Sequence, residues 1–223
     1  MPAPAVLRQS PAALVTAAVV PLALAAVADG IRLRRRLAEA GRDQLTGALR
    51  RESWTPQAQR FLDRYHDQAL VLVCDLDRFK QINDQRGHAV GDQALAETTA
   101  RITAWAGSRG IVCRLGGDEF AAVTRIATGR RTLRLDQLNR ALRQPVTTAI
   151  GPLDIAVSIG AASPDILKTR DLSELLRAAD IAMYDGKHTG HPVQARPEHH
   201  AVPSVNGRRP GRPGTHHATP AAA

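Results

Sequence analysis

Short apolar runs alternate with polar and amphipathic stretches through the middle of the chain. Residues 69–74 form an uninterrupted apolar run, which is typical of a strand buried on both faces of a sheet. Residues 111–113 and 120–123 are two more such runs on either side of a Gly-Gly pair, so they predict two strands joined by a tight hairpin. Leucine and alanine at helical spacing over residues 135–142 predict a helix. The pattern therefore predicts a folded core of strands and helices.

Acidic residues stand where these predicted strands end. Asp75 directly follows the first run, at the carboxyl end of a central strand, where open α/β sheets bind their ligands. Asp118 and Glu119 follow Gly116 and Gly117, whose lack of a Cβ lets a phosphate approach the backbone closely. Mg²⁺ is usually held by one or two carboxylates, with substrate phosphates completing its shell. The acids therefore predict a metal and phosphate site, although a strand-end cap and a solvated hairpin would leave the same pattern.

Several ordered strings then carry a resemblance to a known family. Residues 75–92 read DLDRFKQINDQRGHAVGD, which resembles the DxDxFKxIND..GHxxGD block of GGDEF domains, the diguanylate cyclases. Residues 116–120 are identical to that family's signature, GGDEF. Residues 43–47 resemble its opening DxLTG, 157–160 its late SxG strand, and 179–184 its last helix. The resemblance runs from about residue 43 to residue 190, in the family's order and spacing.

The resemblance implies both a fold and a reaction. The fold is α+β, related to nucleotidyl cyclases and polymerase palms, with a central, mainly antiparallel sheet flanked by helices. The reaction joins two GTP molecules into cyclic di-GMP and releases two pyrophosphates, with one GTP on each protomer of an antiparallel homodimer. The implied cofactor is Mg²⁺, with Mn²⁺ as an alternative, because a metal pair stabilises the attacking and leaving oxygens.

The resemblance also implies roles for individual residues. The metal ligands are the Asp75 carboxylate, the Leu76 backbone carbonyl, and the Asp118 and Glu119 carboxylates. Asp118 and Lys80 are the catalytic candidates, and Asp118 is the candidate acceptor of the 3′-hydroxyl proton.

The implied substrate contacts fall into a guanine group and a phosphate group. An amide and a carboxylate meet the guanine edge, whereas a lysine binds phosphate as a point charge. The substrate-binding residues are Asn83 and Asp92 for guanine, Lys80 and Lys187 for phosphates, and Gly116, Gly117 and His88. For His88, a cap of its own loop is the alternative.

The chain departs from the family's pattern at three places. His191 stands where the family has a triphosphate-facing arginine, and a mostly neutral imidazole lacks that permanent, bidentate charge. Arg50 replaces an asparagine of the opening motif, which argues against firm docking of that segment. Residues 107–110 lack the RxxD pair of the family's product site, so product inhibition through it is not expected. The alternative to a cyclase is therefore a degenerate module that binds GTP or a partner protein without turnover.

The N-terminus predicts a membrane anchor. After a leader over residues 1–8, residues 9–28 carry no charge, and about 20 helical residues span a hydrocarbon core of ~30 Å. Four arginines between Arg32 and Arg36 place the following domain on the cytoplasmic side of a single-pass cell-membrane protein. A cleaved signal peptide and an alanine-rich leader are the alternatives. Residues 29–42 are expected to form a basic linker or signalling helix that pairs two protomers.

The remaining composition limits the function further. The catalytic domain is expected over residues 43–191 and a disordered tail over residues 192–223, where proline, histidine and arginine show no apolar periodicity. The net charge of +9 does not point to nucleic acid, because no basic patch is interleaved with aromatic residues. Cys74 and Cys113 fall inside apolar strands, where reduced, buried thiols are expected. The stimulus is expected to come through an unknown signalling partner or the membrane.

Overall fold

The computed structural model describes residues 27–33, 39–187 and 189–200. The chain divides into two compact units, Met1–Arg42 and Asp43–Ala223. In the first unit, residues 27–33 are helical and largely exposed. The second unit carries the sheet and all the candidate site residues.

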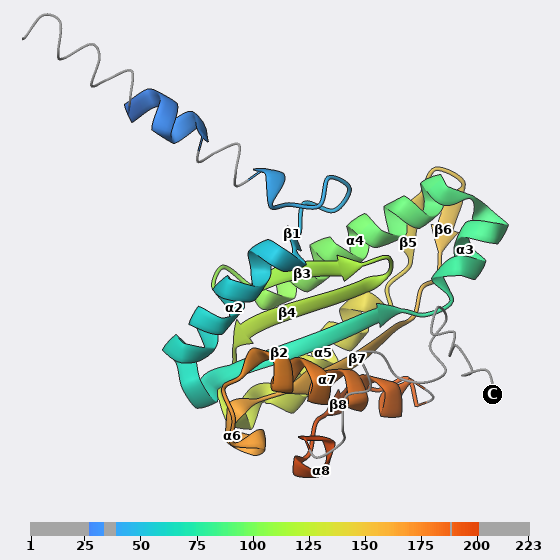
Figure 1. Cartoon of the computed structure of the whole chain (residues 1–223). Coiled ribbons are helices and arrows are strands. Elements are labelled where there is room, and N and C mark those ends of the chain that lie inside the picture. The colour runs from blue at the N-terminus through green and yellow to red at the C-terminus, as the bar shows by residue number, and fades with distance from the viewer. Residues whose placement is uncertain (1–26, 34–38, 188, 201–223) are drawn as a thin grey trace, which may run out of the picture. The chain divides into compact units, whose positions relative to one another are not determined.

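A six-stranded mixed sheet forms the centre of the second unit (Figure 1). Its three inner strand pairs are antiparallel, as the sequence led us to expect, and the pair at each edge is parallel. The strand order is β1 (Leu49–Arg50), β3 (Ile111–Gly116), β4 (Glu119–Arg125), β2 (Ala69–Leu76), β7 (Val157–Ala162) and β8 (Val193–Gln194). A separate two-stranded sheet pairs β5 (Val146–Thr148) with β6 (Gly151–Leu153). The fold is therefore α+β.

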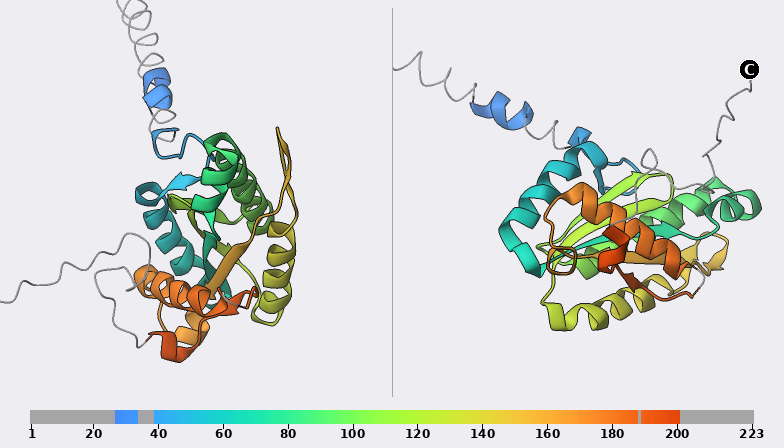
Figure 2. Two further views of the ribbon diagram at one scale, coloured as in Figure 1. Left: turned by 90° about the vertical axis from the view of Figure 1, so that its right-hand side faces the viewer. Right: turned by 60° about the horizontal axis from the view of Figure 1, so that its bottom comes forward.

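Helices cover both faces of the sheet (Figure 2). On one face lie α2 (Arg51–Tyr65) and α7 (Leu172–Gly186), and on the other lie α4 (His88–Ala106) and α5 (Arg131–Leu142). Successive residues of a strand point to opposite faces, so β2 contributes alternate residues to two separate apolar clusters. This explains its uninterrupted apolar run. The shorter elements are η1 (His66–Gln68), α3 (Phe79–Arg86), η2 (Thr128–Arg130), α6 (Pro164–Leu167) and α8 (Pro197–His200).

Two local features fix the position of α7. At its start, the Asp171 side chain accepts hydrogen bonds from the backbone amides of Ser173 at 2.7 Å and Glu174 at 3.1 Å, the arrangement of a helix N-cap. Along its length, α7 approaches β7 so closely that a Cβ on Gly160 would overlap the Ala179 carbonyl oxygen. The glycine of the SxG strand therefore lets the helix lie flat on the sheet, with its C-terminal end near the end of β2.

Both cysteines lie inside the sheet layer. Cys74 and Cys113 are free and buried, and they belong to the apolar clusters on opposite faces. Burial raises the pKa of each thiol to about 12. Because the thiolate is the reactive form, these cysteines are structural residues.

The predicted membrane span over residues 9–28 lies almost wholly outside the described residues. Within residues 27–33, 39–187 and 189–200, no helix combines the length and the apolar character needed to cross a bilayer.

The disordered tail was expected to begin at residue 192, and this boundary is wrong. Val193 and Gln194 form β8, which pairs in parallel with β7 at the sheet edge. The Ala195 amide donates to the Ala161 carbonyl at 2.7 Å, and Ala195 is buried. The edge of β7 supplies backbone partners that local composition does not reveal. Residues 201–223 lie outside the described part of the chain.

Candidate functional site

The carboxyl end of β2 is the centre of the candidate site. Asp75 is only 7% exposed and lies between Glu119 of β4 and Ser158 of β7 in the strand register. The backbone amide of Leu76 donates to the carbonyl of Asp118 at 3.1 Å. Directly opposite side chains on antiparallel strands have Cβ atoms about 4.5–5.5 Å apart. The backbone therefore brings Asp75 and Glu119 together, and two adjacent carboxylates require positive charge nearby.

Lys187, at the C-terminal end of α7, supplies that charge. Its Nζ lies 2.5 Å from Asp75 Oδ2 and 3.7 Å from Asp77 Oδ1. The Ser158 hydroxyl donates to the same Asp77 oxygen at 2.8 Å. Burial raises the pKa of Asp77 and so does the nearby Asp75, although the Ser158 hydrogen bond and the Lys187 ammonium act in the opposite direction. The side chains of Asp75, Asp77, Ser158 and Lys187 thus form one polar network at the ends of β2 and α7.

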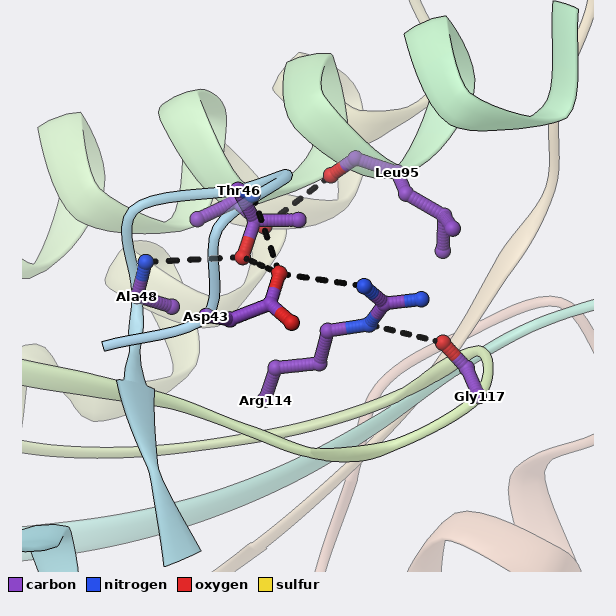
Figure 3. Close-up of polar contacts among 7 residues, drawn as sticks. Asp43, Thr46, Ala48, Leu95, Arg114 and Gly117 are labelled. Atoms are coloured by element: carbon purple, nitrogen blue, oxygen red, sulfur yellow. Dashed lines mark hydrogen bonds and ion pairs between the residues drawn. The ribbon is translucent and has the colours of Figure 1, made fainter. Parts of the chain in front are cut away.

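The signature hairpin is held by the opening motif (Figure 3). Arg114 on β3 donates from Nε to the Gly117 carbonyl at 2.9 Å and from Nη1 to Asp43 Oδ1 at 3.0 Å. Asp43 also accepts from the Thr46 amide at 2.9 Å and the Thr46 hydroxyl at 2.7 Å. Gly117 adopts a φ of +54°, which favours glycine. One arginine therefore connects the DxLTG motif to the turn.

Asp43 has a pKa below its ordinary value. Burial by itself raises that pKa, but the hydrogen bonds from Thr46 and Arg114 and the Arg114 charge outweigh it. These contacts also show how the opening segment is held although Arg50 replaces the asparagine expected in its motif. The opening segment is docked, because β1 pairs in parallel with β3 and places Arg50 beside Arg114 in the register. The doubt that Arg50 raised about this docking is therefore resolved, because Asp43 and the backbone pairing of β1 with β3 hold the segment.

The helices α3 and α4 place the predicted guanine group. Asn83 packs against Gly91 so closely that a Cβ on Gly91 would overlap Asn83 Oδ1. That oxygen is buried and has no hydrogen-bond partner among the described residues. Asp92 follows Gly91 and is exposed. Asn83 and Asp92 therefore lie on the consecutive helices α3 and α4. His88 is the exposed first residue of α4.

The first turn of α3 lies at the same end of β2 as the signature hairpin and the C-terminal end of α7 (Figure 1). Its N-cap, Arg78, adopts the left-handed conformation with a φ of +56°, which is uncommon outside glycine and clusters at functional sites. Lys80, in that first turn, is exposed. A helix N-terminus with a neighbouring lysine suits a phosphate group.

The predicted metal ligands are brought together only in part. Within the described part of the chain, no three histidine, cysteine or acidic side chains form a group able to hold a metal ion. Asp75 and Glu119 are cross-strand neighbours, and Asp118 is joined to β2 through its backbone. A hard cation held by one or two carboxylates takes its other ligands from substrate phosphates and water. The carboxylates of Asp75, Asp118 and Glu119 therefore fit a cation that is coordinated jointly by the protein and by the phosphates of a nucleotide.

Two groups of contacts in the site escaped the sequence reading. One is the link from Ser158 to Asp77, whose only signal was the position of Ser158 in the SxG strand. The other is at Gly190, whose carbonyl accepts from Arg143 Nη2 at 2.7 Å and from Asn139 Nδ2 at 3.2 Å. These α5 residues are separated from Gly190 by 47 and 51 positions, and no sequence pattern marks them. His191, the next residue, is exposed.

The fold and the site define an α+β domain whose Gly-Gly-Asp-Glu hairpin lies beside an acidic strand end. Residues 40–192 match the family model described as diguanylate cyclase, GGDEF domain. The chain belongs to the GGDEF family.

Several relatives share this domain. An uncharacterized 19.3 kDa protein of Streptomyces ambofaciens is 44% identical over 158 residues, covering 71% of this chain and 84% of that protein. The probable diguanylate cyclase DgcC of Escherichia coli K12 is 32% identical and the diguanylate cyclase TpbB of Pseudomonas aeruginosa is 36% identical. These matches cover 70% and 67% of this chain but only 43% of DgcC and 35% of TpbB. The chain therefore spans less than half the length of either named cyclase.

Solved structures agree with this assignment. The isolated GGDEF domain of Pseudomonas aeruginosa TpbB superposes with a TM-score of 0.63 at 32% identity, covering 71% of this chain and 96% of that domain. Diguanylate cyclase SiaD of the same organism, solved with its activator SiaC, gives a TM-score of 0.64 at 25% identity. That match covers 79% of this chain and 70% of SiaD.

Proposed function

We propose that this protein is a diguanylate cyclase that condenses two GTP molecules into cyclic di-GMP and two pyrophosphates. The observation that carries the proposal is the meeting of Asp75, Glu119 and Lys187 at one end of the sheet, beside the signature hairpin. Adjacent carboxylates balanced by one ammonium suit a ligand that brings both a cation and phosphates. Membership of the GGDEF family supports the same reaction.

Phosphate binding would fall to the hairpin, the start of α3 and Lys187. Apart from the chain neighbours of each glycine, no atom of the described residues lies within 4 Å of the Cβ positions of Gly116 and Gly117, so this side of the hairpin backbone is open to a ligand. Lys80 would add charge at the first turn of α3, where backbone amides favour an anion. Lys187 would exchange part of its contact with Asp75 for a phosphate, since both partners are oxyanions.

Guanine recognition would fall to Asn83 and Asp92, with His88 beside them at the start of α4. The buried Asn83 Oδ1 accepts no hydrogen bond from the described residues, and an unsatisfied buried acceptor costs about 1–3 kcal/mol. A guanine presents N–H donors that relieve this cost when the amide turns toward it. The exposed Asp92 carboxylate would accept from the same edge of the base.

Catalysis would depend on positioning and charge. Asp75, Glu119, Asp118 and the Leu76 carbonyl would hold Mg²⁺ or Mn²⁺, which supplies Lewis-acid stabilisation of the attacking and leaving oxygens. Asp118 would accept the 3′-hydroxyl proton. Lys80 would balance the charge that develops on the transferring phosphate.

The assembly and its location are part of the proposal. Each protomer would bind one GTP, so the reaction would require a homodimer with two facing sites. Residues 9–28 would anchor the protein in the cell membrane with the catalytic domain in the cytoplasm, as their lack of charge and the arginines after them suggest. Regulation by a signalling partner is supported by SiaD, which was solved with an activator.

The test uses the purified full-length protein with GTP and Mg²⁺, and mass spectrometry of the products. We expect cyclic di-GMP with two pyrophosphates for each molecule formed, no cyclic product from ATP, and no turnover after chelation of the metal. GTP binding is measured in parallel by calorimetry. Binding without product would favour the alternative of a degenerate module, and the absence of both would overturn either function.

A further inference from the structure

The loop that follows α7 is closed on itself and attached to α5. The Gly186 carbonyl accepts from the Thr189 amide at 2.9 Å and from the Gly190 amide at 3.2 Å, so the chain makes one more turn after the helix. The Gly190 carbonyl then accepts from Arg143 and Asn139 at the end of α5. Two side chains from the opposite face of the sheet therefore fix this loop.

The guanidinium of Arg143 lies directly at Gly190. A Cβ on Gly190 would overlap Arg143 Nη2, and the φ of +67° at Gly190 already favours glycine. Arg143 is exposed, and the one hydrogen bond of its side chain within the described part of the chain uses a single Nη2 donor. A guanidinium has five N–H donors in a planar fork. Most of them therefore face solvent beside residue 191.

The same loop connects the Arg143 guanidinium to Lys187. Lys187 Nζ contacts Asp75 at 2.5 Å, in the centre of the candidate site. Gly190 follows Lys187 by three residues, and its amide donates to the Gly186 carbonyl at 3.2 Å. Lys187 and Arg143 thus place two positive charges at the two ends of one short turn.

The residue at position 191 does not supply a third permanent positive charge. His191 is exposed, and an imidazole has neither the permanent charge nor the planar donor fork of a guanidinium. A linear triphosphate extends its outer phosphates away from the base and the ribose. A permanent, forked cation at the outer end of the site suits those phosphates better than an imidazole.

We propose that Arg143 supplies, from α5, the guanidinium that position 191 lacks, and that it binds the outer phosphates of a nucleoside triphosphate. This inference rests on the proposed function for its ligand, GTP, but not on turnover. Arg143 becomes a substrate-binding residue that increases the preference of the site for triphosphate over monophosphate.

The test measures binding to the full-length protein by calorimetry, with α,β-methylene GTP and with GMP. The methylene bridge prevents loss of pyrophosphate, so affinity is read without turnover. For Arg143→Ala we expect the Kd of the triphosphate analogue to rise about fivefold to tenfold, and that of GMP to change by less than about twofold. The loss should shrink at high salt. Adding His191→Arg to Arg143→Ala should restore most of the affinity, which also shows that the variant is folded.

Two control variants separate charge from structure. Arg140→Ala removes an exposed arginine one turn earlier on α5 and should leave both affinities unchanged. Asn139→Ala removes the second contact with Gly190 but keeps the guanidinium, so a loss as large as that of Arg143→Ala would show that α5 only holds the loop, and would overturn the proposal.

An unchanged triphosphate Kd in Arg143→Ala, or an equal loss for GMP, would also overturn it. These outcomes are distinct from failure of the proposed function. A wild-type protein that binds the analogue but makes no cyclic di-GMP refutes the cyclase and leaves the role of Arg143 to be decided by the affinities.

Discussion

The two ends of the candidate site are built in different ways. At the hairpin end, Asp75 and Glu119 are set opposite each other by the register of neighbouring antiparallel strands. At the α7 end, Lys187 is held by side-chain contacts with Asp75 and Asp77, and Gly190 by side chains from α5. A strand ladder fixes geometry through the backbone, whereas side-chain contacts depend on each residue type. The pairing of Asp75 with Glu119 therefore does not involve the side chain at position 191.

The largest effect is expected at the hairpin end, from Asp75→Asn. This change removes a charge from the proposed metal site and from the contact with Lys187. We expect cyclic di-GMP formation to fall by more than about a hundredfold, because the loss of a charged metal ligand costs several kcal/mol of transition-state stabilisation and about 1.4 kcal/mol is tenfold in rate. Initial rates at saturating GTP measure it. Asp63→Asn, an exposed aspartate on α2, is the matched control. A variant that retained most of the activity would show that this carboxylate does not bind the metal.

The support of the α7 end is tested by Gly160→Ala. The added Cβ would overlap the Ala179 carbonyl oxygen and the Met183 amide, so α7 must shift away from β7. Overpacking of this kind costs about 1–3 kcal/mol of unfolding free energy. Urea denaturation measures the loss. The control is Gly129→Ala, because no described residue beyond its chain neighbours lies within 4 Å of that Cβ position. Equal stability of the two variants would mean that α7 is not seated on Gly160.

The contrast between local backbone geometry and side-chain contacts with distant partners also explains which features the sequence predicts. The strand predicted over residues 69–74 and the Gly-Gly hairpin follow from local patterns, because a buried strand and a tight turn each have a short-range cause. The family resemblance adds Asn83 and Asp92, and the structure places them on adjoining helices.

The features that escaped prediction depend on distant partners. The link between Ser158 and Asp77 joins residues 81 positions apart, and β8 forms only because the edge of β7 offers it backbone partners. The contact of Arg143 with Gly190 also joins residues that are far apart in the sequence, by 47 positions. Local composition around residues 192–200 is rich in proline and histidine, so periodicity gives no strand there.

A smaller effect is expected from Ser158→Ala, which tests the network behind Lys187. The hydroxyl donates to Asp77 at 2.8 Å, and a hydrogen bond to a charged group is worth about 1.5 kcal/mol. Its loss loosens the contact between Asp77 and Lys187, so we expect the KM for GTP to rise up to about tenfold with a smaller change in kcat. Ser108→Ala, on the exposed turn after α4, is the control. An equal fall in kcat with an unchanged KM would place Ser158 in the chemical step instead.

The smallest effect is expected from Asp43→Asn, which weakens the support behind the hairpin without touching its acids. Asp43 accepts from Arg114 and Thr46, so at pH 7 the variant should lose about 1 kcal/mol of unfolding free energy.

The pH dependence of that loss follows from the pKa of Asp43, which is lower in the folded protein than its ordinary value. Such a group contributes stability that is present above its unfolded pKa, about 3.9, and that disappears as the pH falls through the folded pKa. The difference between wild type and variant should therefore be constant near neutrality and shrink below about pH 4. Urea denaturation at a series of pH values measures it, with the exposed Asp154→Asn as control. If the difference in unfolding free energy between wild type and variant persisted in acid, the loss would come from packing of the opening segment. The charge on Asp43 would then have no part in holding the hairpin.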